Sequence, residues 1–352
     1  ILDEKIAVMD TVDRFFTEEW LNNVEQVLSG KTPDYLVIQH MEPDHSASIP
    51  AFLKKYPNAT VVSTAKGFQF MEQFFPEFFA GQGLPAEQRI VAANDGVLEL
   101  GQHSLHFVYA PMVHWPEVMM TYEATEKILF AADGFGKFGA LDVEEEWANE
   151  ARRYYIGIVG KYGPQVQAVL KKAAGLDIQT ICSLHGPVLK ENLGFYLEKY
   201  DKWSSYQPEE SGVVIAYASV YGNTRNAAEY LADVLQEKGQ KTVLYDLARC
   251  DKAKAVADAF RYDRLVLAGI TYNGDLFPCM RSFIEGLTER NYQNRKVAII
   301  ENGTWAPMAG KLILGMFEKS KNLTFTETTV SIKSAMNEQN KGENEKLAEE
   351  LC

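Results

Sequence analysis

The sequence lacks the features that define several classes of protein. It contains no stretch approaching the roughly 18 consecutive apolar residues of a membrane-spanning helix, so we expect a soluble protein with no membrane partner. With 35 Lys and Arg against 48 Asp and Glu, the net charge of −13 argues against a nucleic-acid partner. Its four cysteines show no C-x-x-C spacing, which argues against a disulfide framework or a Cys-ligated metal and favours a reducing compartment, the cytoplasm. No signal-peptide pattern is visible, and because the chain opens at Ile1 rather than Met, we expect its N-terminus to be truncated.

Length and composition predict two domains. A chain of 352 residues corresponds to about two domains, and the polar run Trp203–Gly212, which contains Pro and Gly, is the best boundary. After it, β-rich runs alternate with helical patterns such as Thr224–Lys238, which ends before Gly239. The expected strands are Val213–Ala218, Thr242–Asp246, Arg264–Ala268, Val297–Glu301 and Thr324–Ser331. This alternation predicts a doubly wound parallel sheet.

The first half of the chain is less regular. Helical patterns cover Asp13–Leu28, Ser46–Tyr56 and Glu144–Ala174. The expected strands are Ile6–Met9, Tyr35–Gln39, Thr60–Ser63, Ser104–Ala110, Val118–Tyr122 and Ile128–Ala132. The mixture predicts a layered α/β arrangement, but periodicity alone leaves open whether it has two layers or four.

A dense group of possible metal ligands follows the second expected strand. The segment His40-Met-Glu-Pro-Asp-His45 holds four such side chains within six residues. We expect Pro43 to keep the segment a loop, in which His40 and Glu42 converge on one point and Asp44 and His45 on a neighbouring one. The alternative interpretation is a polar loop that caps the next helix, with Asp44 as the N-cap.

Three further residues lie directly after apolar runs, namely His114, Asp133 and His185. Loops that follow strands gather at one edge of an α/β fold, so we expect the seven side chains to form one site for two metal ions. Three carboxylates, one of them bridging, and a bridging hydroxide would neutralise two divalent ions. The hard oxygen of Glu42 in place of an imidazole favours iron or manganese over zinc. The two remaining histidines are expected to be solvated or core residues: His103 and His106.

The second half carries a pattern for a phosphate group. Ser219-Val-Tyr-Gly-Asn-Thr224 follows a strand and opens a helix, where backbone N–H groups and the helix dipole favour an anion. It is neither a P-loop nor G-x-G-x-x-G, so the monophosphate of FMN fits; the alternative is an ordinary Ser/Gly turn with an N-cap. The loops Thr271–Asp275 and Asn302–Trp305 add Gly, Asn and aromatic residues that can stack on a flat ring. The expected flavin contacts are Ser219, Val220, Tyr221, Gly222, Asn223, Thr224, Thr271, Tyr272, Asn273, Gly274, Asn302, Gly303, Thr304 and Trp305.

Taken in order, these motifs resemble the flavodiiron proteins, also called A-type flavoproteins, over nearly the whole chain. The resemblance implies an α/β fold in which a metallo-β-lactamase-like αββα diiron domain in residues 1–206 precedes a flavodoxin-like FMN domain in residues 211–352. It implies an oxidoreductase that reduces dioxygen to water, nitric oxide to nitrous oxide, or both.

The resemblance also implies cofactors and partners. One iron ion is assigned to His40, Glu42, His114 and Asp133. The other is assigned to Asp44, His45, His185 and the bridging Asp133, although the residue matching His45 does not bind directly in some relatives. FMN relays electrons to this diiron centre, which carries a bridging oxygen species. A head-to-tail homodimer, which can pair into a dimer of dimers, is expected. No Cys-pair rubredoxin module follows the flavodoxin half, so the electron donor is expected to be external, such as rubredoxin.

Two other interpretations remain open at this point. The first is a zinc hydrolase of the metallo-β-lactamase type fused to a flavodoxin, against which Glu42 argues. The second is a non-catalytic electron carrier with a degenerate metal domain, against which the seven intact ligand positions argue.

Overall fold

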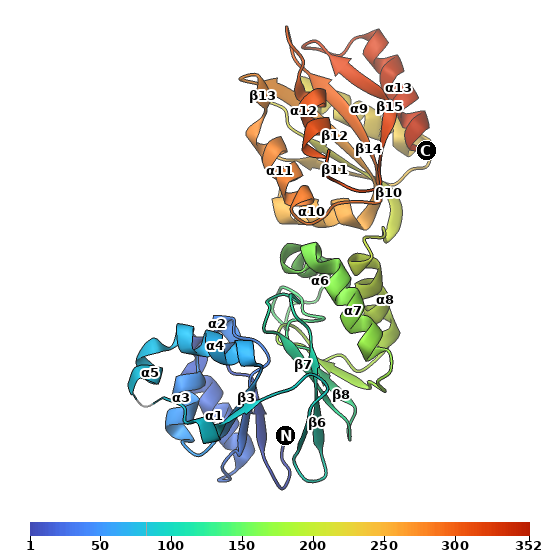
Figure 1. Ribbon diagram of the computed structural model, residues 1–352. Helices are drawn as coiled ribbons and strands as arrows, with labels where there is room; N and C mark the ends of the chain where they lie inside the picture. Colours follow the sequence, from blue (N-terminus) through green and yellow to red (C-terminus); the bar gives the residue numbers. More distant parts are fainter. Residues whose placement is uncertain (82) are drawn as a thin grey trace. The chain divides into compact units, whose positions relative to one another are not determined.

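The chain folds into two compact units, each built from segments that are separate in the sequence. Figure 1 shows the computed structural model, which describes residues 1–81 and 83–352. Unit 1 comprises Ile1–Glu145 and Pro164–Glu198, and unit 2 comprises Glu146–Gly163 and Lys199–Cys352. Residues 146–163 and 199–206, which lie before the expected domain boundary, thus pack with the second half of the chain. The extents of the two sequence domains remain a prediction.

Unit 1 begins with a sheet of four short parallel strands. In sheet order these are β1 (Ala7–Met9), β2 (Tyr35–Val37), β3 (Thr60–Ser63) and β4 (Arg89–Val91). The connections contain α1 (Thr17–Leu28), α2 (Pro43–Ser46), α3 (Ile49–Lys55), α4 (Ala65–Phe74) and α5 (Pro76–Gly81). Side chains alternate across the sheet. Leu36 and Ile38 pack with Phe52 of α3 and Phe68 of α4, whereas Val37 belongs to the core on the other face.

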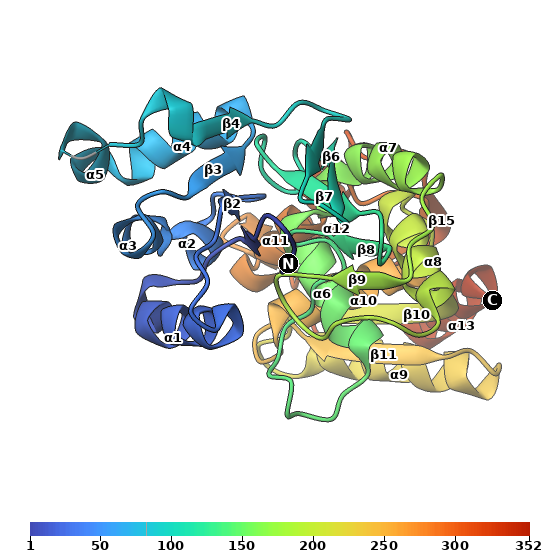
Figure 2. The same ribbon diagram turned by 90° about the horizontal axis from the view of Figure 1, so that it is seen from below.

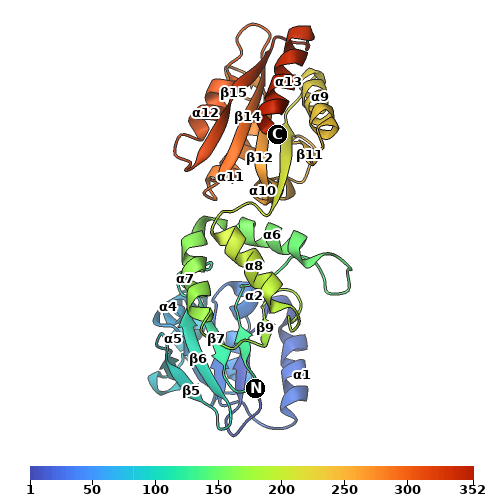
Figure 3. The ribbon, with the colours of Figure 1, turned by 90° about the vertical axis from the view of Figure 1, so that its right-hand side faces the viewer.

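A second sheet covers that other face. Its order is β5 (Val97–Glu99), β6 (Ser104–Tyr109), β7 (Met119–Glu123), β8 (Ile128–Phe130) and β9 (Thr180–Cys182). Neighbouring strands are antiparallel except for β8 and β9, which are parallel. Val37 and Val62 of the first sheet share one core with Leu105, Phe107 and Met119 of the second. Helix α7 (Gly163–Ala173) runs beside β6 and β7 (Figures 2 and 3). The layers are therefore those of a metallo-β-lactamase-like αββα fold.

Unit 2 contains the predicted doubly wound sheet. Its order is β11 (Thr242–Asp246), β10 (Glu210–Tyr217), β12 (Tyr262–Tyr272), β14 (Arg295–Asn302) and β15 (Leu323–Ile332), all parallel, and β13 (Asp275–Leu276) pairs with β12. The helices are α9 (Asn223–Glu237), α10 (Lys252–Arg261), α11 (Pro278–Thr288), α12 (Ala309–Met316) and α13 (Glu338–Leu351). Helices α9 and α13 pack on one face, and α11 and α12 lie on the other (Figure 3). This strand order is that of flavodoxin, so the predicted fold class is confirmed.

The expected helix over Glu144–Ala174 is wrong. The structure has α6 (Trp147–Ile158), a 3₁₀ turn at Gly160–Tyr162, and then α7. The break coincides with Gly160 and with Gly163–Pro164, where proline cannot continue a helix. Gly163 also lies close to α8 (Leu193–Ser204), since a Cβ atom at this position would be 2.3 Å from the carbonyl oxygen of Ser204. Helix α6 instead packs with α8, and the rings of Trp147 and Trp203 stack with centroids 5.9 Å apart.

Further elements were not expected from the sequence: helices α4, α5 and α8, and several short strands. Strands β4, β5, β9 and β13 have two or three residues each, which is too short for a periodic pattern to appear. Among the helices of the described residues, none is long and apolar enough to cross a membrane.

Candidate metal centre and cofactor cavity

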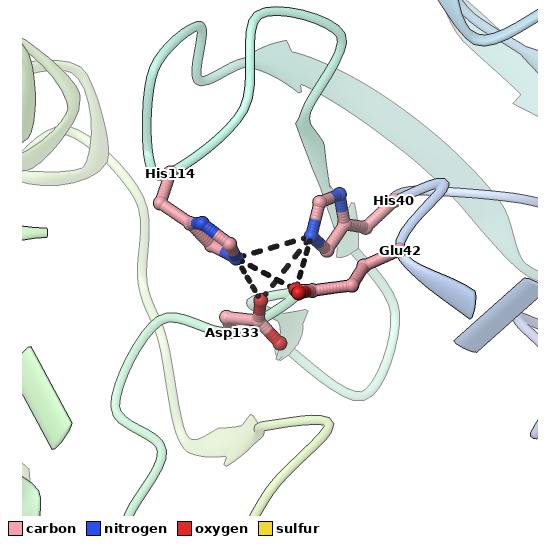
Figure 4. A group of neighbouring side chains, drawn as sticks. All are labelled: His40, Glu42, His114 and Asp133. Atoms are coloured by element: carbon pink, nitrogen blue, oxygen red, sulfur yellow. Dashed lines mark hydrogen bonds and ion pairs between the residues drawn. The ribbon is translucent and has the colours of Figure 1, made fainter. Parts of the chain in front are cut away.

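Four of the predicted ligands meet in unit 1 (Figure 4). His40 and Glu42 lie between β2 and α2, His114 lies between β6 and β7, and Asp133 follows β8. His114 Nε2 lies 3.0 Å from Glu42 Oε2, 2.9 Å from Asp133 Oδ2 and 3.2 Å from His40 Nε2. His40 Nε2 lies 3.3 Å from Glu42 Oε2 and 3.4 Å from Asp133 Oδ2. All four donor atoms therefore face one point.

The other three predicted ligands form a second group. Asp44 Oδ2 lies 3.2 Å from both His45 Nε2 and His185 Nε2, and these two nitrogens lie 3.0 Å apart. The expectation that Pro43 keeps this segment a loop is wrong, because Pro43 is the first residue of α2. A proline fits the first turn of a helix, where its missing N–H would have no partner. Asp44 and His45 therefore project from one helical turn.

Asp133 connects the two groups through its two carboxylate oxygens. Oδ2 faces His40 and His114, whereas Oδ1 lies 3.2 Å from His45 Nε2 and 3.5 Å from His185 Nε2. The side chain is only 2% exposed. A carboxylate in this position can bind two ions at once, which is the bridging geometry expected of this residue.

The spacing and polarity of both groups suit metal ions. Ligands at about 2.0–2.2 Å from a metal ion lie about 3.0–3.5 Å from each other in octahedral or tetrahedral coordination. The distances within each group match this spacing. Oδ1 of Asp44 and Oδ1 of Asp133 are also buried, and neither has a hydrogen-bond partner within the described part of the chain. Buried carboxylate oxygens without donors are expected where a cation binds.

The pKa values in the first group are shifted by the close contacts between its imidazoles and carboxylates. Burial alone would lower the pKa of His40, but its contacts with Glu117 and Glu42 raise the pKa to about 10. Burial likewise opposes the charged form of His114, yet Asp133 and Glu42 raise its pKa to about 9. In return, the hydrogen bonds of His114 and His40 lower the pKa of Glu42 to about 2. The carboxylates thus hold protons on the imidazoles, and divalent cations can replace those protons.

Sequence reasoning did not identify Glu117. Its side chain is 1% exposed, and Oε1 lies 2.7 Å from His40 Nδ1 and 3.0 Å from the backbone nitrogen of Met41. The signal was present, since an acidic residue three positions after His114 is followed by an apolar strand. His103 lies outside both groups and donates hydrogen bonds to the Asp3 carboxylate through Nδ1 and its backbone N–H, and His106 lies on β6.

A cavity of about 610 Å³ opens in unit 2 at the carboxyl ends of β10, β12 and β14. All the predicted flavin contacts line it except Gly222, whose φ of +89° instead forms the turn into α9. Four residues that were not predicted also line it: Ile270, Ala306, Met308 and Ser334. The volume lies within the usual range for small-molecule and cofactor sites.

The lining of the cavity suits a phosphate and a flat ring. The Ser219 hydroxyl is buried and has no hydrogen-bond partner among the described residues, and it lies just before the start of α9. The side chains of Tyr221 and Trp305 are 91% and 92% exposed, so their faces are free to stack. The hydroxyl of Thr271 has another role, because it accepts hydrogen bonds from the backbone of Met308 and Ala309.

Comparisons with known proteins agree with both sites. Residues 1–186, more than half of the chain, match the family described as ODP family beta lactamase, and residues 214–324 match a flavodoxin domain. The chain belongs to the flavodiiron protein family. The family's two iron ions and FMN fit the metal-ligand groups of unit 1 and the cavity of unit 2.

Two relatives of this flavodiiron protein illustrate the similarity. The nitric oxide reductase of Moorella thermoacetica is 28% identical over 322 residues, which cover 89% of this chain and 79% of that protein. The putative diflavin flavoprotein A 2 of Synechocystis is 32% identical over 71% of this chain, and this match spans only 43% of its own length.

Solved structures share the fold. The rubredoxin oxygen:oxidoreductase of Desulfovibrio gigas matches with a TM-score of 0.91 at 23% identity, covering 100% of this chain and 88% of that one. The flavodiiron protein of Giardia intestinalis matches with a TM-score of 0.86 at 24% identity, covering 99% of this chain and 87% of that one.

Proposed function

We propose that this flavodiiron protein is an oxidoreductase that reduces dioxygen to water, nitric oxide to nitrous oxide, or both. The observation that carries the proposal is the pair of adjacent ligand groups joined by Asp133, on a chain that also holds a flavin-sized cavity. The relative named nitric oxide reductase supports the choice of gas substrates. Two ferrous ions and one reduced FMN together hold four electrons, the number that converts one dioxygen to two waters.

The proposed ligand assignment follows the two groups. His40, Glu42, His114 and Asp133 hold one iron ion, and Asp44, His45, His185 and Asp133 hold the other. The Nε2 atom of His45 faces the second group, which supports direct binding by this residue. Three carboxylates for two ions make the site harder than an all-histidine site, which favours iron over the zinc of a hydrolase.

The proposed flavin contacts are the predicted residues of the cavity. The Ser219 hydroxyl and the first turn of α9 supply donors for the FMN phosphate. Tyr221 and Trp305 stack on the ring system. No lysine or arginine lines the described cavity, so these neutral donors and the helix dipole carry the binding of the phosphate.

We further propose an external electron donor such as rubredoxin and a head-to-tail homodimer. Exposed apolar residues occur in unit 1 in the segments that follow β1 and β8, namely Phe15 and Phe16 in a 3₁₀ turn and Phe138 and Leu141 after β8. Exposed aromatic residues surround the cavity of unit 2. A homodimer in which each metal-site rim packs on the partner's flavin loops would cover both surfaces.

Anaerobic turnover tests the function. The protein, loaded with iron and FMN and fully reduced, is mixed with limiting dioxygen or nitric oxide, and gas consumption and nitrous oxide are measured. We expect one dioxygen to be consumed for every four electrons, or one pair of nitric oxide molecules for every two electrons. His40→Ala should abolish consumption. His103→Ala, which removes a histidine that also contacts a carboxylate but lies outside the ligand groups, should leave it intact. Full activity with zinc in place of iron would refute the proposal.

A further inference from the structure

Glu117 is a buried carboxylate that belongs to neither ligand group. It lies two residues before β7, whereas His40 follows β2, and 77 residues separate the two in the sequence. Its Oε1 atom accepts a hydrogen bond from the backbone N–H of Met41 at 3.0 Å and lies 2.7 Å from His40 Nδ1. The single oxygen thus contacts both the ring of His40 and the backbone that follows it.

The orientation of His40 depends on this contact. Nε2 of His40 faces the other donor atoms of the first group, so a metal ion bound there would leave the ring's proton on Nδ1, which donates a hydrogen bond to Glu117 Oε1. The contact therefore selects the tautomer whose Nε2 lone pair is free for a metal ion. The backbone hydrogen bond from Met41 also fixes the segment that leads from His40 to Glu42.

We propose that Glu117 is a positioning residue for the first metal ion, which makes the two metal positions unequal. This inference rests on the proposed metal centre. Both side-chain hydrogen bonds of Glu117 that the described structure contains go to the His40–Met41 segment, which serves the first group. A metal-ligand histidine that donates to a carboxylate is a more basic ligand, so Glu117 strengthens binding at this position and stabilises the more oxidised ion.

Charge balance gives a second reason for this role. Two divalent ions carry four positive charges, and the ligands Glu42, Asp44 and Asp133 supply three negative charges. Before a bridging hydroxide binds, Glu117 would supply the fourth, within hydrogen-bond distance of a ligand. Its other oxygen, Oε2, is buried and has no hydrogen-bond partner among the described residues. Burying such a carboxylate lowers the stability of the fold, and electrostatic attraction to nearby bound cations would offset this cost.

Metal titration of two variants tests the inference. Glu117→Gln keeps an oxygen that can accept the two hydrogen bonds but removes the charge. The matched control is Glu123→Gln, because Glu123 is also a buried carboxylate (1% exposed) that accepts two backbone hydrogen bonds, from Thr125 and Glu126. Metal-free proteins with FMN bound are titrated with Co(II) alone, and binding is followed by visible absorption. The midpoint potentials of the iron-loaded proteins are measured separately.

We expect wild type and Glu123→Gln to bind two equivalents of Co(II) alike. Glu117→Gln should bind one equivalent normally and the other about 10- to 100-fold more weakly, as is typical when a partner of a metal-ligating histidine is lost. The potential of one iron should rise. Two unchanged equivalents, or equal weakening of both, would overturn the inference. If Glu117→Gln does not fold, Glu117→Asp, which keeps the charge but has a shorter side chain, is titrated instead. Weaker binding of one equivalent supports the inference, and two unchanged or equally weakened equivalents overturn it. A wild-type protein that binds no Co(II) would refute the metal centre itself.

Discussion

Inside unit 2, the carboxylate of Glu209 accepts hydrogen bonds from three side chains. Trp203 Nε1 and Lys199 Nζ each donate at 2.7 Å, and Arg152 donates through both Nε and Nη2. The side chain of Glu209 is fully buried and that of Arg152 is 3% exposed. These four residues, which we term the Glu209 clasp, join α6 and the end of α8 to the segment that enters β10.

The contribution of the Glu209 clasp to folding stability can be worked out from the pKa shift of Glu209. Burial alone would raise the pKa of Glu209, but Arg152 and Lys199 outweigh it and lower the pKa to about 2, from an ordinary value of 4.5. A shift of this size corresponds to about 3 kcal/mol of folding stability at neutral pH. Because the folded pKa lies below the unfolded one, this contribution is complete above about pH 4.5 and is lost as the pH falls towards 2.

We therefore expect Glu209→Gln to lower the free energy of unfolding by about 3 kcal/mol at pH 7, since it leaves Arg152 buried without a counter-charge. Urea unfolding followed by tryptophan fluorescence measures this change, because Trp203 lies within the clasp. The neighbouring Glu210 is a matched control. It pairs with Lys241 and Arg261 but its side chain is 33% exposed, so Glu210→Gln should cost less than about 1 kcal/mol.

Two results would refute this reasoning. One is equal destabilisation by Glu209→Gln and Glu210→Gln, which would mean that burial of the carboxylate does not matter. The other is a pH dependence between about pH 5 and pH 3 that stays the same when Glu209 is replaced by Gln. Wild type should lose stability through this window, whereas the variant should lose less because its amide does not titrate.

Three further predictions concern the cofactors and the assembly. Glu42→His should shift metal preference from iron towards zinc and abolish gas reduction; elemental analysis that still finds two iron atoms per chain would contradict it. Asn223→Ala with Thr224→Val removes two donors at the start of α9, each worth about 1.5–3 kcal/mol to a charged group, so FMN affinity should fall at least about 100-fold at normal iron content. Unchanged binding in a flavin titration would place the phosphate elsewhere. Asp133→Ala with His114→Ala should yield an inactive homodimer that retains FMN. Mixed with the FMN-deficient variant, it should form mixed dimers with up to about half the normal activity, and inactive mixed dimers that hold both cofactors would exclude transfer across the dimer.

The features predicted from the sequence are those that depend on short-range patterns. The five strands of the doubly wound sheet are long and apolar, so their positions and parallel order follow from alternation with helices. The seven candidate ligands and the flavin loops each follow a strand, and the fold places such loops at one edge. Their convergence is therefore a consequence of topology: the structure brings the candidate ligands together within unit 1 and the flavin loops together within unit 2.

The features that were missed depend on contacts between distant residues. The Trp203–Gly212 run has the composition of a polar linker, yet Trp203 and Tyr206 are buried and Glu209 is enclosed by donors. The break between α6 and α7 is an exception, because the local sequence carries a helix-stop signal at Gly160 and at Gly163–Pro164 that was overlooked. Glu117 was not identified because it lies just before β7, whereas the ligands were sought directly after strands.

Buried carboxylates in the two units differ in what neutralises them, and this difference separates a structural role from a metal-binding one. In unit 2, Glu209 meets Arg152 and Lys199, which are permanent cations of the chain, so the clasp is complete by itself. In unit 1, the partners that lower the pKa of Glu42 and Asp133 are histidines. Neutral histidines are metal ligands and bring no charge of their own. Without metal, the positive charge that these acids meet is carried by protons on the imidazoles, and divalent ions can replace those protons. The positions of lysine and arginine relative to buried acids thus indicate a metal centre as clearly as the ligands themselves do.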